Sequence, residues 1–358
     1  MGPSRQGRLL VAKEVSRPIP SEAAQLGFLA NVQRILEEGR FTATYKFALL
    51  IALTDLAVEC GDHDGDALTL PLNAIAEKFI AMYWGHTRPF AGAILQQSTG
   101  ENIALLRRLA EMQSLAPMLA AARRLPEWSA FVRTVAQLVQ IMPLYKLQAL
   151  RGGGRLVFLY EEKAEHGTIR LLPGVAYCLR RFSGLIRMLA RNAWVDEVRG
   201  YAANRQYVAE SHSLPEFLFG VDRGVLNRVR EVLQALQAGR CFYCHEPVHH
   251  GAQVDHFVPF ALYPSDLAHN FVLAHSGCNG DKASLLADLP HLDSWIERND
   301  RHGDEIAGRL SDSRIVADRE SAVGIAKWAY HRAADSASLL WCSCGVTRPF
   351  PSGAVLPF

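Results

Sequence analysis

The sequence lacks any apolar segment long enough to cross a membrane. Its longest apolar run extends from Phe47 to Leu53 and ends at Thr54, whereas a membrane-spanning helix needs about 20 apolar residues. The basic N-terminal segment has no apolar core of the kind found in secretory signals, and Gln6 breaks the myristoylation pattern. We therefore expect a cytoplasmic protein without a membrane partner.

A strong net charge is also absent. The 358 residues include 38 Lys and Arg against 36 Asp and Glu, a formal charge of +2, which excludes a polycationic chain. The balance is uneven, because residues 141–240 carry fifteen basic against nine acidic residues and residues 241–340 carry eight against fourteen. A basic segment before an acidic one fits a phosphate-binding surface beside a metal-holding site. Local bias on a solvated face explains the counts equally well.

Apolar residues recur at helical spacing through most of the first half of the chain. The clearest helix begins at Pro126, where apolar side chains repeat at i, i+3, i+4 and i+7 up to Met142, and a proline in the first turn suits a helix start. Another predicted helix ends at Gly61. We expect a helical domain over residues 21–150, preceded by a flexible tail over residues 1–20.

The pattern changes at the glycine-rich segment 151–154. Two short apolar segments, RLVFLY and TIRLL, predict a β-hairpin with Gly167 in its turn. The helix predicted next carries Arg180, Arg187 and Arg191 on one broad face at 100° per residue. We predict that this face contacts DNA phosphates; a solvated helix paired with local acids is the competing interpretation.

The seven cysteines are odd in number, and three of them lie within 38 residues, interleaved with histidines. An odd count without a secretory signal argues against a disulfide framework and for metal binding. Cys241 and Cys244 form a pair with a two-residue gap, and thirty residues separate them from a second such pair, His275 and Cys278. Four nitrogen and sulfur ligands from two tight turns make a closed, structural zinc site. Other histidines offer alternatives to His275 as the fourth ligand: His245, His249, His250 and His269.

Between the two pairs lie the elements of a small folding unit. The segment VDHFVP contains Asp255 and His256, an apolar segment follows Asn270, and CNGDK opens a helix. The order strand, long loop, strand, helix predicts a ββα unit whose ends are clamped by the zinc ion.

This order of motifs resembles the HNH endonuclease family of the ββα-metal class, over about residues 240–290. The CxxC pair, the Asp-His-x-x-Pro, the Asn fourteen residues later and the Cys-Asn-x-x-Lys follow one another as in that family. His275 stands where many zinc-bearing members have cysteine, and Asn279 replaces the third histidine of the family name. Histidine ligates zinc equally well, and asparagine keeps an oxygen ligand for a second metal.

The resemblance implies a role for each polar residue of the unit. His256 is the general base that takes a proton from water. Asp255 and Asn279 supply oxygen ligands to a catalytic Mg²⁺ or Mn²⁺. Asn270 braces the loop that carries His256. Lys282 contacts phosphate, although a solvated helix lysine is the simpler interpretation.

We therefore expect a mainly α protein with a small α+β part, in which a helical N-terminal domain precedes a zinc-stabilised HNH nuclease domain. The expected activity is metal-dependent hydrolysis of DNA, and architecture alone suggests bacterial restriction or anti-phage defence. One alternative is a zinc-stabilised nucleic-acid-binding module that does not cleave. Another is a subunit of a larger defence complex.

The predicted domains and assembly complete this interpretation. The segments are the tail (1–20), the helical domain (21–150), a β-hairpin with basic helices continuous with it (151–215), the HNH domain (216–300), and a C-terminal helix with an irregular tail (301–358). Because one HNH site cuts one strand, cutting a duplex favours a two-fold homodimer formed through residues 21–215. A monomeric nicking enzyme is the competing possibility.

Overall fold

The structure of the chain is a computed structural model, which describes residues 17–39, 42–99, 104–161, 167–208, 213–220, 225–310 and 315–358. Helices account for 58% of the structure and strands for 12%, so the expected mainly α chain with a small β part is confirmed. None of the helices in these ranges is both long enough and apolar enough to span a bilayer. Most of the predicted flexible tail over residues 1–20 lies outside the described residues.

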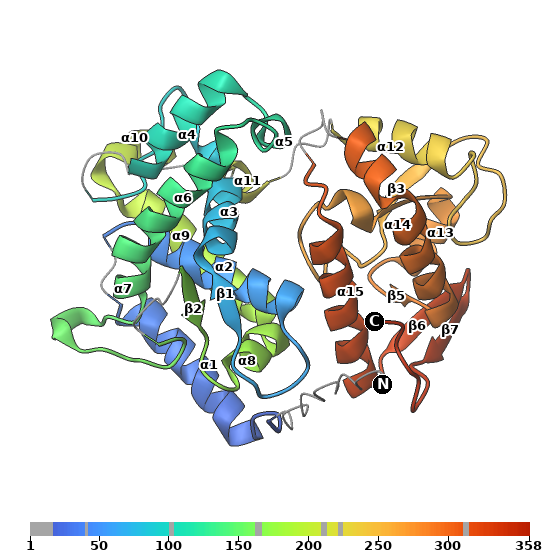
Figure 1. The fold of residues 1–358 in the computed structure, drawn as a ribbon, viewed down its shortest axis with the longest axis horizontal. Coiled ribbons are helices and arrows are strands. Elements are labelled where there is room, and N and C mark those ends of the chain that lie inside the picture. The colour runs from blue at the N-terminus through green and yellow to red at the C-terminus, as the bar shows by residue number, and fades with distance from the viewer. Residues whose placement is uncertain are drawn as a thin grey trace, which may run out of the picture.

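Two lobes lie side by side in Figure 1. The helical lobe is built around α2 (Tyr45–Cys60), which is buried on nearly all sides because its sequence is apolar around most of its circumference. Helices α3 (Leu72–Tyr83) and α9 (Ser183–Gly200) pack against α2, and α6 (Trp128–Val139) packs on α3. The remaining helices of this lobe are α1 (Glu22–Glu37), α4 (Ala104–Leu115), α5 (Leu119–Ala122), α7 (Tyr145–Leu147), α8 (Val175–Arg181), α10 (Arg205–Val208) and α11 (Leu214–Phe219).

The helices predicted to end at Gly61 and to begin near Pro126 are confirmed as α2 and α6. The second is shorter than predicted, because a π-helical turn over Gln140–Leu144 that contains Pro143 follows α6. Met142 lies in this turn and is 39% exposed. It therefore does not belong to the buried face of the helix.

The predicted β-hairpin is confirmed only in part. Tyr160 of RLVFLY forms an antiparallel bridge with Leu171, and the N–H of Leu172 donates to the carbonyl of Leu159. Strand β2 (Thr168–Arg170), however, pairs antiparallel with β1 (Thr69–Pro71), and Arg155 bridges to Ala149 instead. Leu70 and Ile169 lie opposite each other and are almost fully buried. The pairing of β2 with β1 therefore brings the apolar side chains of Leu70 and Ile169 together as a cross-strand pair.

The C-terminal lobe (described residues 225–358) confirms the predicted order of strand, loop, strand and helix. Strand β3 (Gln253–His256) pairs antiparallel with β4 (Phe271–Ala274), and α13 (Ser276–Lys282) follows. The other elements are α12 (Val225–Leu236), β5 (Leu286–Ala287), α14 (Leu289–Arg309), α15 (Arg319–Asp335), β6 (Leu339–Ser343) and β7 (Val346–Pro349). Strands β6 and β7 form a hairpin and β5 runs parallel to β6, so the irregular tail begins only after Pro349.

The predicted boundaries at 215/216 and 300/301 fall inside α11 and α14. Leu214 and Leu218 of α11 belong to the hydrophobic core of the helical lobe. Helix α14 is continuous across residue 300, and its side chains Trp295 and Ile306 are both fully buried. Neither position is therefore a break between independent parts of the chain.

The two lobes meet where α15 packs against α2 (Figure 1). Gly324 lies so close to α2 that a Cβ there would stand 1.9 Å from the carbonyl oxygen of Glu59. Beside this contact the Tyr263 hydroxyl donates to Glu59 at 2.6 Å, and the Trp328 indole donates to the carbonyl of Arg180 at 3.0 Å. Close backbone approach and buried hydrogen bonds thus join the lobes.

Gly324→Ala should loosen this contact. The added methyl group overlaps the Glu59 carbonyl, so α15 must move away from α2, and overpacking of this kind costs about 1–3 kcal/mol. Thermal unfolding of the full chain measures the change. Gly308→Ala in α14 is the matched control, because nothing lies within 4 Å of its added carbon; it should leave stability unchanged or raise it slightly. Equal melting temperatures for both variants would contradict the interface.

Candidate functional site

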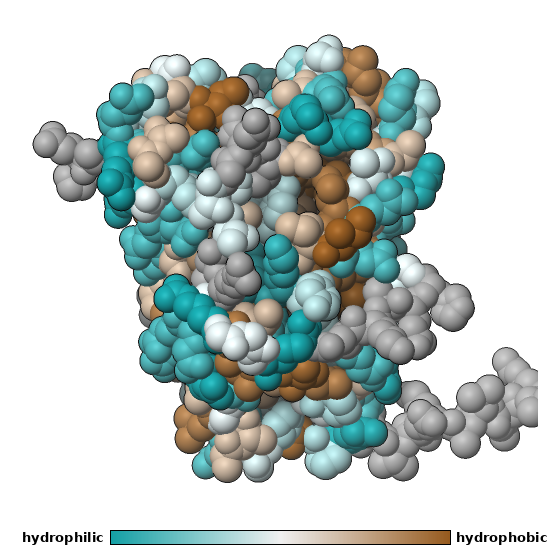
Figure 2. All heavy atoms as spheres, turned by 90° about the vertical axis from the view of Figure 1, so that its left-hand side faces the viewer, coloured by the Kyte–Doolittle hydropathy of each residue, from teal (hydrophilic) through white to brown (hydrophobic). Residues whose placement is uncertain are grey.

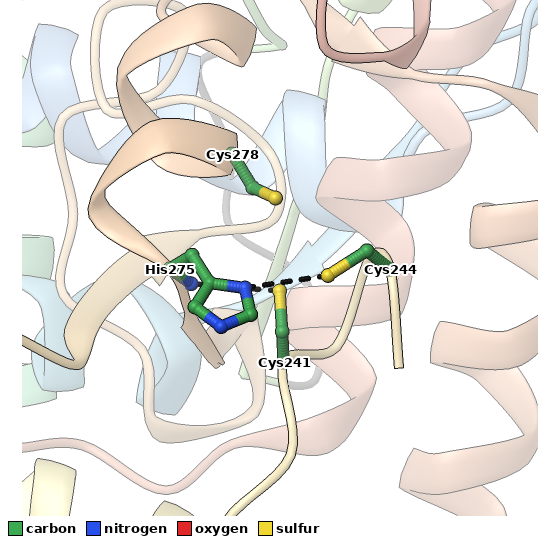
Figure 3. A group of neighbouring side chains, drawn as sticks. All are labelled: Cys241, Cys244, His275 and Cys278. Atoms are coloured by element: carbon green, nitrogen blue, oxygen red, sulfur yellow. Dashed lines mark hydrogen bonds between the residues drawn. The ribbon is translucent and has the colours of Figure 1, made fainter. Parts of the chain in front are cut away.

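Four ligand atoms converge at one end of the β3–β4–α13 unit (Figure 3). Cys241 and Cys244 lie in a turn before β3, His275 is the N-cap of α13, and Cys278 lies in its first turn. All four ligand atoms lie within 4.8 Å of one another, and Cys244 Sγ is 3.3 Å from His275 Nδ1. In tetrahedral zinc, bonds of about 2.0–2.3 Å hold ligand atoms about 3.5 Å apart. The donor set and its spacing therefore fit a zinc ion.

The imidazole of His275 is oriented for this role. Its Nε2 lies 3.1 Å from the carbonyl oxygen of Pro247, while Nδ1 faces the sulfurs. An Nε2–H that donates to a carbonyl leaves the Nδ1 lone pair for a metal, as ligating histidines commonly do. The CxxC turn closes tightly, because His245 adopts a left-handed φ of 61° and its N–H donates to the carbonyl of Cys241.

The other histidines predicted as alternatives lie elsewhere. His269 is 2% exposed, and its Nε2 lies 3.1 Å from the carbonyl oxygen of Gly303. Three more lie on the surface and outside the group of four ligands: His245, His249 and His250. Among the described residues, His275 is therefore the histidine that completes the cluster.

The cysteine thiols of the cluster differ in how readily they ionise. Burial, with the neighbouring Cys241 and Cys244, raises the pKa of the Cys278 thiol. Burial also opposes ionisation of Cys241, but backbone N–H groups of Cys244 and His275 outweigh it and lower the pKa of that thiol. A bound dication favours the thiolate at each position, so its binding free energy adds to folding.

A further sulfur lies close to the cluster. Cys344, in the turn between β6 and β7, is exposed, and its Sγ lies 4.0 Å from Cys278 Sγ. It is not one of the four atoms that lie within mutual reach. No spacing signal in the sequence links Cys344 to Cys278, since 65 residues separate them.

His256 ends β3, and its side chain has a carboxylate partner. Its Nε2 lies 2.7 Å from Asp266 Oδ1, and the imidazole ring packs between Phe260 and Phe271 with ring centroids 5.2 and 4.7 Å away. The side chain is 19% exposed, so a ligand can reach it. No sequence motif marks Asp266, which lies in the loop between the strands. A catalytic histidine commonly has an acidic partner, and this general rule is the only signal for Asp266.

Asp255 points to the opposite face of β3, as strand alternation requires. The Tyr243 hydroxyl donates to its carboxylate at 2.5 Å, and Lys282 Nζ lies 3.0 Å from it. Lys282 is fully buried and also donates to the backbone carbonyl of His256. The predicted phosphate contact of Lys282 is therefore wrong, because its ammonium group is enclosed and needs Asp255 as a buried counterion.

The structure does not join Asp255 and Asn279 into a second metal site. The Asn279 amide donates to Gln253 Oε1 at 2.7 Å, and the Asp255 carboxylate is taken by Tyr243 and Lys282. A dication here would compete with the ammonium group of Lys282 for the same oxygens. The predicted Mg²⁺ ligands thus do not fit a divalent ion in this arrangement.

Asn270 occupies the bracing position that the sequence predicts. Its Oδ1 accepts from the backbone N–H of Val258 at 2.8 Å, and its Nδ2 donates to the Val258 carbonyl at 2.9 Å. The Asn270 carbonyl also accepts from the N–H of Phe257. These three bonds hold the backbone just after His256, so the bracing role is confirmed.

The arginines predicted to contact DNA do not form an exposed face. Arg180 and Arg187 are 3% and 4% exposed. Arg180 donates to the carbonyls of Ala57 and Val58 and so caps the C-terminal end of α2. Arg187 pairs with Asp55 at 2.6 Å. The prediction is wrong for both, because each guanidinium satisfies buried oxygen atoms; Arg191 is considered below.

Comparison with known proteins identifies the helical lobe. Residues 25–217 match a family model described as a domain of unknown function, DUF8808, and this match covers more than half of the chain. The protein therefore belongs to the DUF8808 family. The matched segment runs from α1 into α11 and leaves out the whole Cys-His cluster. No curated protein and no solved structure matches the chain.

Cys278→Ser should remove the bound zinc that this cluster predicts. Zinc content is expected to fall from about one ion per chain to near zero, and the lobe should melt at a lower temperature because metal binding stabilises its fold. Elemental analysis and thermal unfolding of freshly purified protein measure both. Cys344→Ser is the matched control and should keep its zinc. If Cys344→Ser loses zinc and His275→Ala keeps it, the assigned ligand set is wrong.

Proposed function

We propose that the C-terminal lobe hydrolyses phosphodiester bonds of DNA, with His256 as its general base. The observation that carries the proposal is the pairing of His256 with Asp266 beside a Cys-Cys-His-Cys cluster that fits zinc. The order of motifs that resembles the HNH endonucleases supports it, as does the strand, loop, strand and helix arrangement. A zinc-clamped β-hairpin would hold the histidine at the surface of a small, rigid unit.

The geometry of the pair suits proton abstraction. When Nε2–H donates to the Asp266 carboxylate, Nδ1 keeps its lone pair and can accept a proton from water. The carboxylate then stabilises the imidazolium that forms. The aromatic rings of Phe260 and Phe271 restrict rotation of the imidazole. Asn270 fixes the backbone that follows, so the base is positioned before substrate arrives.

A catalytic Mg²⁺ or Mn²⁺ is expected from the resemblance, but no step is assigned to it. Its predicted ligands Asp255 and Asn279 have other partners, as described above. Cleavage is therefore measured both with and without divalent ions. Activity that rises when Mg²⁺ or Mn²⁺ is added to metal-depleted buffer would support the predicted requirement.

A second candidate function is nucleic-acid binding without cleavage. The buried ion pair of Asp255 with Lys282 favours it, because this pair occupies the carboxylate that a nuclease of the resembling family needs for its metal. A binding module needs the zinc-clamped fold but not the His256–Asp266 pair. Cleavage by the full chain, lost on changing His256, separates the two functions.

The proposed partner of the protein is DNA. The protein would act in the cytoplasm, in restriction or anti-phage defence. The expected homodimer through residues 21–215 remains a prediction. The apolar helix faces that motivate it are largely used inside the helical lobe, whose buried side chains form one continuous core. Figure 2, which faces this lobe, shows apolar residues in separate areas among polar ones.

His256→Ala should abolish cleavage while leaving the fold intact. Removing a general base lowers the rate by about a hundredfold or more. The assay uses the full chain with supercoiled, linear, single-stranded and modified DNA, with and without Mg²⁺ or Mn²⁺. His250→Ala, an exposed histidine of the same lobe, is the control and should cleave normally. Undiminished cleavage by His256→Ala would eliminate the assignment.

Asp266→Asn should slow cleavage without preventing substrate binding. The amide cannot stabilise the imidazolium and favours the wrong tautomer, so the maximal rate should fall about tenfold or more while the KM changes little. Asp293→Asn, an acid in α14 that no step of the proposal uses, provides the comparison. A fall confined to KM would assign Asp266 to substrate binding rather than to His256.

A further inference from the structure

A cavity of about 1140 Å³ lies between the two lobes. The helical lobe contributes α2, α3, α9 and α11 to its walls. The C-terminal lobe contributes the loop around Asp266 and the start of α15. A volume of this order accommodates a ligand the size of a nucleotide. The cavity is separate from the Cys-His cluster and from Asp255, none of which lines it.

Three of the six acids that line the cavity are paired with a basic side chain. Asp55 pairs with Arg187 Nε at 2.6 Å, and Glu59 pairs with Lys78 at 2.6 Å. The other lining acids with a partner are Glu77 with Arg123, Asp266 with His256, and Asp318, which caps α15. Glu320 lies exposed in the first turn of α15. Each lining acid of the helical lobe, where the arginines lie, therefore has a cationic partner, and the acids without one belong to the C-terminal lobe.

Two arginines of α9 retain unused donors. Arg191, half-buried in the wall, has no hydrogen bond or ion pair with a described residue; its Nε is buried, and its guanidinium lies over the Phe219 ring at 5.1 Å. Arg187 has both Nη atoms buried without a partner, and stacks on Tyr263 at 4.0 Å. Buried donors without acceptors are costly. An acceptor that enters the cavity at Arg191 would relieve this cost.

The cavity wall is partly apolar and aromatic. Phe219 lies against Arg191, and Phe217, Trp84 and Met118 also line the cavity. Aromatic side chains stack on nucleobases of any sequence, and a guanidinium matches phosphate oxygens through paired hydrogen bonds. A cationic group and a flat apolar surface thus lie side by side. A nucleotide carries the matching groups, an anionic phosphate and a flat base.

We propose that this cavity binds a nucleotide phosphate, with Arg191 as its principal cationic contact and the adjoining aromatic wall as the surface for the base. The phosphate belongs either to a free nucleotide or to a nucleic-acid strand. Arg187 stays paired with Asp55 beneath the Tyr263 ring and is not a direct contact in the proposal. The site adjoins the pair proposed for cleavage, because Asp266 lines the cavity, but its principal contact, Arg191, is not part of that pair.

Calorimetric titration of the full chain, without divalent metal, tests the site. The probes are the four nucleoside monophosphates, inorganic phosphate and a twelve-nucleotide single strand. Arg191→Gln should weaken binding about tenfold or more, as expected for loss of a charged hydrogen-bonded pair. Arg199→Gln is the matched control, because Arg199 lies on the same helix, is 44% exposed and does not line the cavity; it should bind as the unchanged protein does.

The outcomes separate the sources of the phosphate. Binding of a monophosphate, weakened only by Arg191→Gln, assigns the site to free nucleotides, and the same pattern with the strand alone assigns it to nucleic acid. No binding by any probe, or equal weakening by both variants, overturns the proposal. If Arg191→Gln fails to fold, Arg191→Lys replaces it and should bind more weakly than the unchanged protein; equal binding again overturns the site. Because this site is tested by binding with Arg191→Gln and the nuclease by cleavage with His256→Ala, a failure here and a failure of the nuclease proposal are distinguishable.

Discussion

The convergence of three sulfurs and one imidazole nitrogen is the constraint on which the C-terminal lobe depends. The elements that they join are short: β3 and β4 have four residues each and α13 has seven. Such elements are too small to fix one another by packing alone. A metal bound by these four residues would link the turn at Cys241 to the start of α13 and hold the β-hairpin against the helix. That arrangement in turn places His256 on one face of β3 and Asp255 on the other.

The lobes are joined by buried polar groups as much as by apolar packing. Glu59 of α2 accepts from Tyr263 and Ser321 of the C-terminal lobe and pairs with Lys78 of its own lobe. Tyr263 lies three residues before Asp266, the partner of His256. The DUF8808 segment therefore contacts the loop that orients the candidate base. This contact gives the helical lobe a physical route by which to influence the site without contributing a residue to it.

Features that depend on residues close together in the sequence are predictable from the sequence alone. The Cys-His cluster is predictable because each pair needs only a two-residue gap, and α2 and α6 are predictable because apolar spacing defines a helix. Partners distant in the chain have no such signal: the pairing of β2 with β1 crosses about a hundred residues, and Asp266 carries no motif. The burial of Arg180 and Arg187 could not be predicted, because charge on a helix face looks the same in the sequence whether it meets solvent or oxygen atoms of the same chain, such as the Asp55 carboxylate.

We infer that a zinc ion bound by three cysteines and one histidine organises the lobe that presents His256. X-ray absorption at the zinc edge of freshly purified full-length protein measures this coordination. We expect one zinc per chain with three sulfur neighbours at about 2.3 Å and one nitrogen neighbour at about 2.0 Å. A shell of four sulfurs would place Cys344 where the structure puts His275, and protein that holds no zinc would contradict the account.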